Sequence, residues 1–214
     1  MNVILFGPPG AGKGTQAGAV CDRYSIPQVA TGDIFRKNLK ENTELGQLAR
    51  SFMDKGQLVP DEVVWQLVED RLSWDDVAGG VLLDGFPRTV KQAELLVDWA
   101  GRTGRGIDAV VALEVPDDEL VARLSGRRTC LSCGATYHVA HNPPAVDAVC
   151  DKCGSEVVQR KDDNEVTVRE RLATYHRQTA PVLSFFESKG MATRVDGTGA
   201  IDAIRERVQA AIGR

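Results

Sequence analysis

The sequence has little of several features that mark other classes of protein. No apolar run approaches the length needed to span a membrane, about 18 residues. The first residues already enter a short apolar run and not a targeting segment. We therefore expect a cytoplasmic protein without membrane contact. The net charge is −4, and the stretch from Cys130 to Cys153 lacks interleaved aromatic and basic residues, which argues against a nucleic-acid partner. The five cysteines cannot form an even set of disulfides, and four fall in two close pairs, which favours metal binding.

What is present is typical of a globular α/β protein. With 214 residues, 43% of them hydrophobic, the chain can bury one sizeable core and carry a small insertion. Nearly unbroken apolar runs alternate with helical patterns, which predicts a parallel five-stranded sheet with helices on both faces. The expected strands cover residues 3–6, 28–30, 81–83, 110–115 and 192–195. Segments 43–53, 61–72, 90–99, 117–127, 165–189 and 201–212 are expected helices.

A glycine-rich motif follows the first apolar run. Residues 7–13 fit G-x-x-x-x-G-K before a helical stretch, a context in which backbone N–H groups surround a phosphate and Lys13 reaches the outer phosphates. The alternative is a glycine-rich turn with a solvated lysine. Gly14 stands where a Ser or Thr usually contacts magnesium. We therefore expect Thr15 to contact phosphate, and a carboxylate elsewhere to help hold magnesium.

A second polar stretch follows the strand expected at residues 81–83. Asp84 is placed to hold a magnesium-bound water, and Arg88 can clamp a phosphate through two parallel N–H bonds. Gln92 lies four residues after Arg88, on the same helix face, where it can read the edge of a base. The alternative is a strand-end turn with a surface salt bridge. Thr31, at the end of another strand, can in turn simply cap the helix that follows.

Several motifs together resemble adenylate kinase along the whole chain, in its long-lid bacterial form. They are residues 7–15 (GPPGAGKGT), 31–33 (TGD), 84–89 (DGFPRT), 126–128 (GRR) and 160–163 (RKDD). The resemblance implies a P-loop NTPase-like core of residues 1–29, 60–125 and 164–214. It also implies an AMP-binding flap (30–59), an inserted metal-binding lid (126–163) and a cis bond between Phe86 and Pro87. The implied enzyme is a monomer that transfers a phosphoryl group reversibly from MgATP to AMP, giving two ADP.

The resemblance also implies roles for individual residues. ATP would be held by Gly10, Ala11, Gly12, Lys13, Gly14, Thr15, Arg123 and Arg127. AMP would be held by Thr31, Arg36, Gly85, Arg88, Gln92, Arg160 and Arg171. The catalytic set would be Lys13, Asp84, Arg88, Arg127, Arg160 and Arg171, with Asp84 supporting magnesium.

Elementary chemistry agrees with these roles without requiring them. Phosphoryl transfer needs alignment and charge neutralisation more than a general base, and we name no base. From the residues alone, Arg123 and Arg127 can instead form a solvated helix face, and Arg171 can lie over the core. Asp162 and Asp163 can pair with these arginines or remain as solvated charges of a hinge.

The four paired cysteines predict a structural metal site. Cys130-x-x-Cys133 and, sixteen residues later, Cys150-x-x-Cys153 can surround one tetrahedral ion with no open position. Zinc is the expected ion, and iron or cobalt accepts the same ligands. We expect the ion to fold the lid without taking part in transfer. The alternative is two redox pairs, which normally stand at the start of a helix.

Two other functions remain open at this point. A UMP or CMP kinase would use the same chemistry on another acceptor. A zinc-ribbon ATPase that binds nucleic acid would also combine the glycine-rich motif with four cysteines. The acidic net charge disfavours this second alternative.

Overall fold

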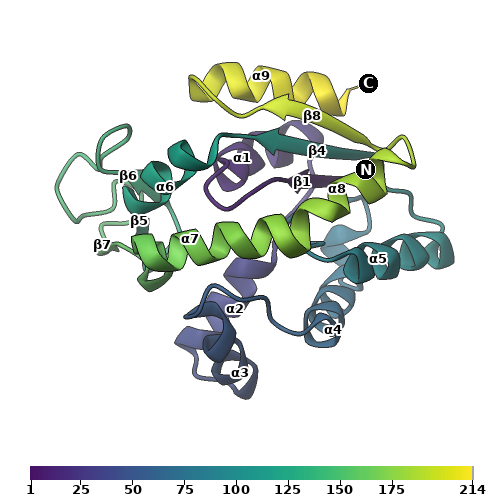
Figure 1. The fold of residues 1–214 in the computed structure, drawn as a ribbon, viewed down its shortest axis with the longest axis horizontal. Coiled ribbons are helices and arrows are strands. Elements are labelled where there is room, and N and C mark those ends of the chain that lie inside the picture. Colours follow the sequence, from purple (N-terminus) through teal and green to yellow (C-terminus); the bar gives the residue numbers. More distant parts are fainter. Residues whose placement is uncertain (214) are drawn as a thin grey trace.

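A five-stranded parallel sheet forms the centre of the structure, a computed structural model that describes residues 1–213 (Figure 1). The strand order is β2-β3-β1-β4-β8, and every neighbouring pair is parallel. The strands are β1 (Asn2–Phe6), β2 (Gln28–Ala30), β3 (Val81–Asp84), β4 (Ala109–Glu114) and β8 (Ala192–Asp196). The predicted sheet is therefore confirmed.

Both faces of this sheet are covered. Along β1, Val3 and Leu5 belong to one hydrophobic core, and Ile4 and Phe6 to the other, which is why the strand reads as an unbroken apolar run. The first core includes side chains of α1 (Lys13–Tyr24), α6 (Asp117–Ser125), α7 (Glu165–Thr174) and α9 (Ile201–Ile212). The second includes side chains of α2 (Thr31–Lys40), α3 (Glu44–Met53), α4 (Asp61–Leu72), α5 (Val90–Thr103) and α8 (Ala180–Glu187).

The helix predicted over residues 165–189 is not one regular helix. The structure has α7, then a π-helical turn at Tyr175–Thr179, then α8. Pro181 lies in the first turn of α8 and has no backbone N–H to donate to the carbonyl four residues earlier. The backbone N–H of Ala180 bonds instead to the carbonyl of Tyr175, five residues earlier, and this wider turn accommodates the proline.

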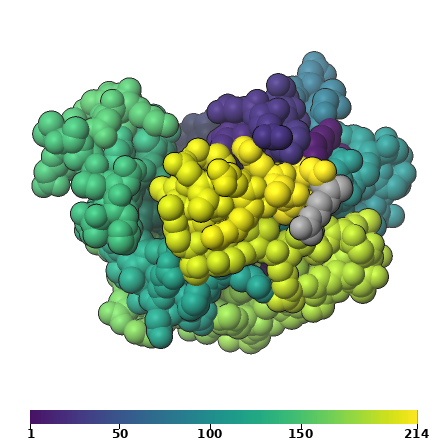
Figure 2. Space-filling view, turned by 90° about the horizontal axis from the view of Figure 1, so that it is seen from above, coloured from purple at the N-terminus to yellow at the C-terminus, as the bar shows by residue number. Residues whose placement is uncertain are grey.

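The segment expected to form the lid (126–163) contains a small antiparallel sheet of three strands, separate from the central sheet. Its strands are β5 (Arg127–Cys130), β6 (Thr136–His138) and β7 (Val157–Val158), in the order β6-β5-β7. It has its own small core, and it projects from one side of the molecule in the space-filling view (Figure 2). The short helical turn Lys161–Asp163 leads from the lid back to α7.

Three local findings concern the sequence predictions. The Phe86–Pro87 bond is cis, as expected. Thr31 is the first residue of α2 and not its cap, because Ala30 takes the cap position and the Thr31 hydroxyl bonds elsewhere. None of the described helices has both the length and the apolar character that crossing a membrane requires.

Candidate active site

The phosphate loop (residues 7–15) runs from the end of β1 into α1. Gly7 has φ +140° and Gly10 has φ +85°, conformations that residues with a side chain rarely adopt. A Cβ on Gly7 would lie 2.6 Å from the carbonyl oxygen of Leu113, and one on Gly10 would lie 2.9 Å from Cγ of Leu124. The two glycines therefore allow the loop to pack closely on β4 and α6.

Lys13 is the first residue of α1, and its side chain turns back over the loop. Its Nζ donates hydrogen bonds to the carbonyl oxygens of Gly7 (2.7 Å) and Pro8 (2.8 Å). Burial lowers the pKa of Lys13 to about 8, the Asp84 carboxylate opposes this shift, and the charge of Arg88 adds to it. The ammonium is thus held at the loop while still protonated at neutral pH.

Asp84, at the end of β3, lies next to the start of α1. Its Oδ2 is 3.9 Å from where a Cβ of Gly14 would stand, and it accepts a hydrogen bond from Nε2 of Gln28 (3.1 Å). Burial raises the pKa of Asp84, and Lys13 and Arg88 oppose this. A carboxylate therefore occupies the neighbourhood of the missing Ser or Thr hydroxyl. The contact with Gln28 was not predicted, because no sequence pattern links the two residues.

Thr31 and Arg88 meet at the backbone of Gly85. The hydroxyl of Thr31 (2.8 Å) and Nε of Arg88 (2.7 Å) both donate to the carbonyl oxygen of Gly85. Gly85 has φ +73°, and a Cβ there would lie 2.9 Å from Nη2 of Arg88. Burial lowers the pKa of Arg88 to about 10, and the charge of Arg171 contributes. The structure brings together three of the residues expected at the AMP side.

Gln92 is buried at the start of α5, with both ends of its amide engaged. Its Oε1 accepts from the backbone N–H of Arg88 (2.8 Å), and its Nε2 donates to Oδ1 of Asp61 (2.8 Å). Asp61 also accepts a hydrogen bond from Thr89 (3.1 Å). Gln92 thus fixes the backbone that carries Arg88, through a partner that sequence reasoning missed. Its expected contact with a base stays a prediction.

Two arginines from separate elements converge on one buried carboxylate. Nε and Nη2 of Arg127, in β5, donate to Oδ2 (2.8 Å) and Oδ1 (2.6 Å) of Asp163, whose side chain is 0% exposed. Nη1 of Arg171, in α7, donates to the same Oδ1 (3.0 Å) and also pairs with Asp162 (3.0 Å). Asp163 therefore links β5 to α7. Of the two alternatives left open for Asp162 and Asp163, the structure shows the pairing with arginines and not a solvated hinge.

The remaining predicted arginines divide into two places. Arg160 donates to the Thr129 hydroxyl (2.9 Å), and burial lowers its pKa to about 9, with the charges of Arg36 and Arg127 contributing. Arg36 forms an ion pair with Asp33 (2.5 Å), and its charge helps to lower the pKa of Arg88 as well as that of Arg160. Arg36, Arg88 and Arg160 therefore form one cationic cluster. Arg123 lies on α6, paired with Glu119, and donates to the carbonyl oxygen of Gly197 (3.0 Å).

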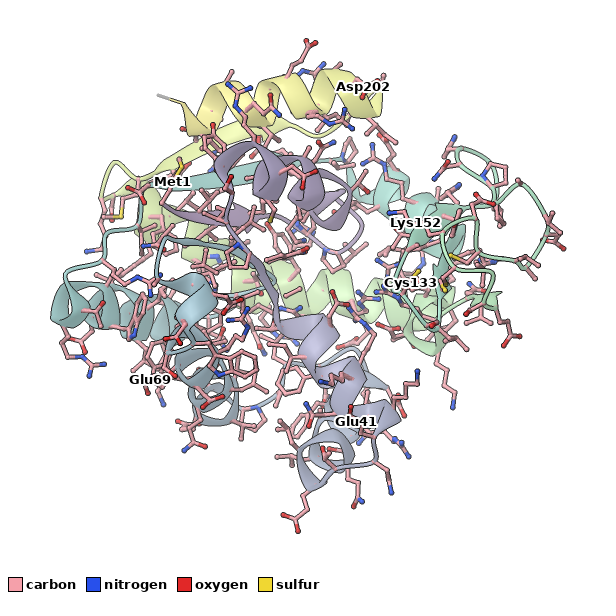
Figure 3. All side chains as sticks on the ribbon, turned by 180° about the vertical axis from the view of Figure 1, so that it is seen from behind. Met1, Glu41, Glu69, Cys133, Lys152 and Asp202 are labelled. Carbon is pink, nitrogen blue, oxygen red and sulfur yellow. The ribbon has the colours of Figure 1, made fainter. Side chains whose placement is uncertain are left out.

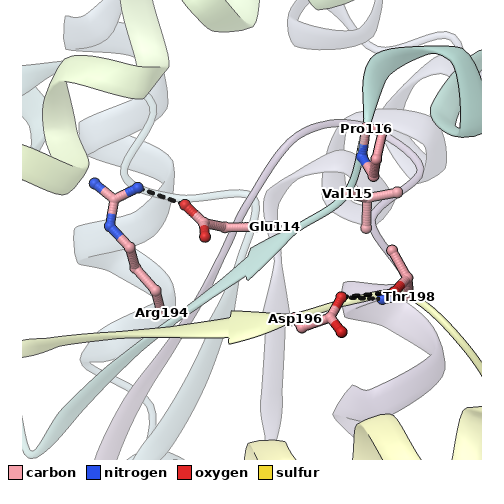
Figure 4. A pocket seen from close by; sticks show the side chains of 6 residues that line it. All are labelled: Glu114, Val115, Pro116, Arg194, Asp196 and Thr198. Atoms are coloured by element: carbon pink, nitrogen blue, oxygen red, sulfur yellow. Dashed lines mark hydrogen bonds and ion pairs between the residues drawn. The ribbon is translucent and has the colours of Figure 1, made fainter.

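A separate pocket lies where β4 and β8 end (Figure 4). Glu114 pairs there with Arg194, and Asp196 accepts hydrogen bonds from the backbone N–H (2.9 Å) and hydroxyl (2.7 Å) of Thr198. None of the predicted site residues lines this pocket. Its polar side chains are bonded to one another, and we assign it no part in the site.

The four cysteines of the lid form one cluster, which includes Cys133 in Figure 3. Their sulfur atoms all lie within 4.8 Å of one another, with Cys130 and Cys153 at 3.5 Å and Cys133 and Cys150 at 3.6 Å. A regular tetrahedron of sulfurs about 2.3 Å from zinc has edges of about 3.8 Å, so the arrangement fits such an ion. Neither Cys-x-x-Cys pair begins a helix, which removes the context for redox pairs.

Comparison with known proteins agrees with this geometry. A family model described as "Adenylate kinase" matches residues 5–191. The chain belongs to the adenylate kinase family. The adenylate kinase of Clostridium perfringens (strain SM101 / Type A) is 54% identical over 213 residues, covering 100% of this chain and 99% of the relative. That of Syntrophobacter fumaroxidans (strain DSM 10017 / MPOB) is 53% identical over 213 residues and 100% of both chains. The resemblance seen in the motifs is thereby confirmed along the chain.

Proposed function

We propose that the protein catalyses reversible phosphoryl transfer from MgATP to AMP, giving two ADP, as expected of its family. One observation carries this proposal. Arg88, Arg127 and Arg171 come from three separate segments, yet all lie close enough to Lys13 for their charges to lower its pKa. Positive charge gathered at a phosphate loop suits two facing polyphosphates, whose oxygens repel one another until they are neutralised.

Each group of residues has a share in the proposed reaction. The loop from Gly10 to Thr15 holds the ATP phosphates, with Arg123 and Arg127 as further ATP ligands. AMP is held by Thr31, Arg36, Gly85, Arg88, Gln92, Arg160 and Arg171. The arginines Arg88, Arg127, Arg160 and Arg171, together with Lys13, align the substrates and neutralise the transferred group, which lowers the barrier without a general base.

Asp84 is the proposed protein contact for magnesium. Its buried carboxylate lies beside the phosphate loop. Burial raises the pKa of this carboxylate, and a cation bound there would offset the cost of burying its negative charge. Magnesium bound with ATP neutralises the phosphate oxygens. Asp84 would hold a water of the ion, and Gln28 would keep the carboxylate in place.

The proposed domains are a core of residues 1–29, 60–125 and 164–214, the flap (30–59) and the lid (126–163). Closure of flap and lid over the substrates would exclude water that otherwise hydrolyses ATP. In the lid, we propose a structural zinc ion on Cys130, Cys133, Cys150 and Cys153; iron or cobalt fits the same ligands. We further propose a cytoplasmic monomer without a nucleic-acid partner.

An acceptor panel tests the reaction. ADP formation is measured from ATP with AMP, UMP or CMP, with EDTA as the control that removes magnesium. We expect AMP to be the preferred acceptor and EDTA to abolish transfer. Faster transfer to a pyrimidine nucleotide would favour the alternative kinase, and ATP hydrolysis that depends on added RNA or DNA would favour the nucleic-acid ATPase.

Lys13→Ala tests the phosphate loop. Loss of one preorganised charge should reduce turnover by at least about 10²–10³-fold with the fold intact. Lys189→Ala is the matched control, because Lys189 is exposed and its Nζ lies over the Phe185 ring, 4.9 Å from the centroid, outside the site. A near-normal rate for Lys13→Ala would refute the role of Lys13.

A further inference from the structure

Tyr137 connects the two cysteine-bearing turns of the lid. Its side chain, 8% exposed, packs in the lid core with Cys130, Cys150 and Val157. Its hydroxyl oxygen accepts the backbone N–H of Asp151 (2.8 Å) and lies 3.3 Å from Sγ of Cys150. Tyr137 belongs to β6, in the hairpin that carries Cys130 and Cys133, whereas Cys150 and Asp151 begin the other turn.

The direction of the bond to Cys150 follows from the chemistry of the sulfur. A cysteine that ligates a metal does so as a thiolate and has no hydrogen to donate. The tyrosine oxygen already accepts the N–H of Asp151, and its own hydrogen is free to point at the sulfur. Hydrogen bonds to charged groups are stronger than neutral ones, so this contact gains strength when the site is loaded.

We propose that Tyr137 is a positioning residue of the metal site: its hydroxyl donates to the ligating Cys150 thiolate and holds the second cysteine turn against the first hairpin. This role rests on the proposed metal site. Groups that hydrogen-bond to metal ligands orient those ligands and tune how strongly they bind the metal. Losing such a group typically costs about 10–100-fold in metal affinity.

The register of the lid sheet separates this role from nucleotide binding. In the antiparallel pair β5–β6, Tyr137 stands opposite Arg128, and His138 stands opposite Arg127. Consecutive strand residues point to opposite faces. Tyr137 therefore faces the metal side, and its neighbour shares the face of Arg127, the proposed ATP ligand. Removing the Tyr137 hydroxyl should change metal retention without removing an ATP contact.

Tyr137→Phe in the full-length, zinc-loaded chain is the test, because it keeps the packed ring and removes only the hydroxyl. Zinc release to an excess of a chromophoric chelator should be about 10–100-fold faster than in the wild type. Tyr24→Phe is the matched control, since the Tyr24 hydroxyl makes no hydrogen bond among the described residues. Val157→Ala is the second variant, because it loosens the same core and leaves the hydroxyl in place.

The absorption spectrum of bound cobalt separates a change at the metal ligands from a loss of packing in the lid core. In the cobalt-loaded chain, the sulfur-to-metal absorption band should shift in Tyr137→Phe and stay in place in Val157→Ala. Zinc release from Tyr137→Phe at the wild-type rate, or an unshifted cobalt band, would overturn the role of Tyr137. Failure of the wild type itself to retain one metal ion per chain would overturn the metal site, and this role with it.

Discussion

Raising the pH should remove the charge of Lys13 before that of Arg88 or Arg160. Burial lowers the pKa of Lys13 to about 8, whereas the pKa values of Arg88 and Arg160 fall only to about 10 and about 9. In the proposed site, the protonated ammonium of Lys13 in the free enzyme receives the phosphates of ATP. We therefore expect kcat/KM for MgATP to fall as the pH rises through about 8.

The size of the fall follows from this pKa. About nine tenths of Lys13 is protonated at pH 7 and about one tenth at pH 9, so kcat/KM should fall about tenfold between them. Bound ATP adds negative charge beside the ammonium and raises its pKa, so kcat should decline at a higher pH than kcat/KM. Each unit between the two profiles corresponds to about 1.4 kcal/mol of added interaction with Lys13.

Direct chromatographic measurement of ADP at saturating AMP and constant ionic strength avoids coupling enzymes that fail at high pH. Circular dichroism at each pH confirms that the fold persists. The residual activity of Lys13→Ala is the control: it should lack the fall centred near pH 8 and decline only at higher pH, where Arg160, with a pKa of about 9, begins to lose its charge. A wild-type kcat/KM that is unchanged up to pH 9.5, or an equal fall in Lys13→Ala, would refute the reasoning.

Three further predictions concern stability and the metal. Asp163→Asn removes the buried carboxylate that Arg127 and Arg171 share, so the free energy of unfolding should fall by about 3–5 kcal/mol in a denaturant titration; an unchanged midpoint would contradict the pairing. Thr174→Val removes a buried hydroxyl without a partner among the described residues, and stability should rise by about 1 kcal/mol. Chelation of the metal proposed for the lid should make residues 126–163 sensitive to protease. Lost turnover with a folded, resistant lid would show instead that the ion takes part in transfer.

The parts of the fold that follow local rules could be predicted from the sequence. Strand β1 is buried on both faces, so its apolar run is unbroken, and the loop after it needs glycines wherever neighbours approach closely. Both signals lie within a few consecutive residues. The two cysteine pairs are similarly local, and their sulfur atoms meet as their spacing implied.

Contacts between distant polar side chains could not be predicted in this way. Gln28 and Asp84 are 56 residues apart, and Asp61 and Gln92 are 31 apart, so no periodicity connects them. The π-helical turn before α8 was missed for a different reason. Pro181 has a known effect on a regular helix, but a helix can absorb it by ending or by widening, and only the packing decides which.

The hydrogen bonds from Lys13 to the carbonyl oxygens of Gly7 and Pro8 affect the entropy cost of binding a nucleotide. A free lysine side chain loses about 2 kcal/mol of rotamer entropy when it is immobilised. Here folding has already restricted that freedom, so an arriving anion meets a charge that needs little further ordering. In the proposed function, the charge that binds the ATP phosphates is therefore positioned before the nucleotide arrives.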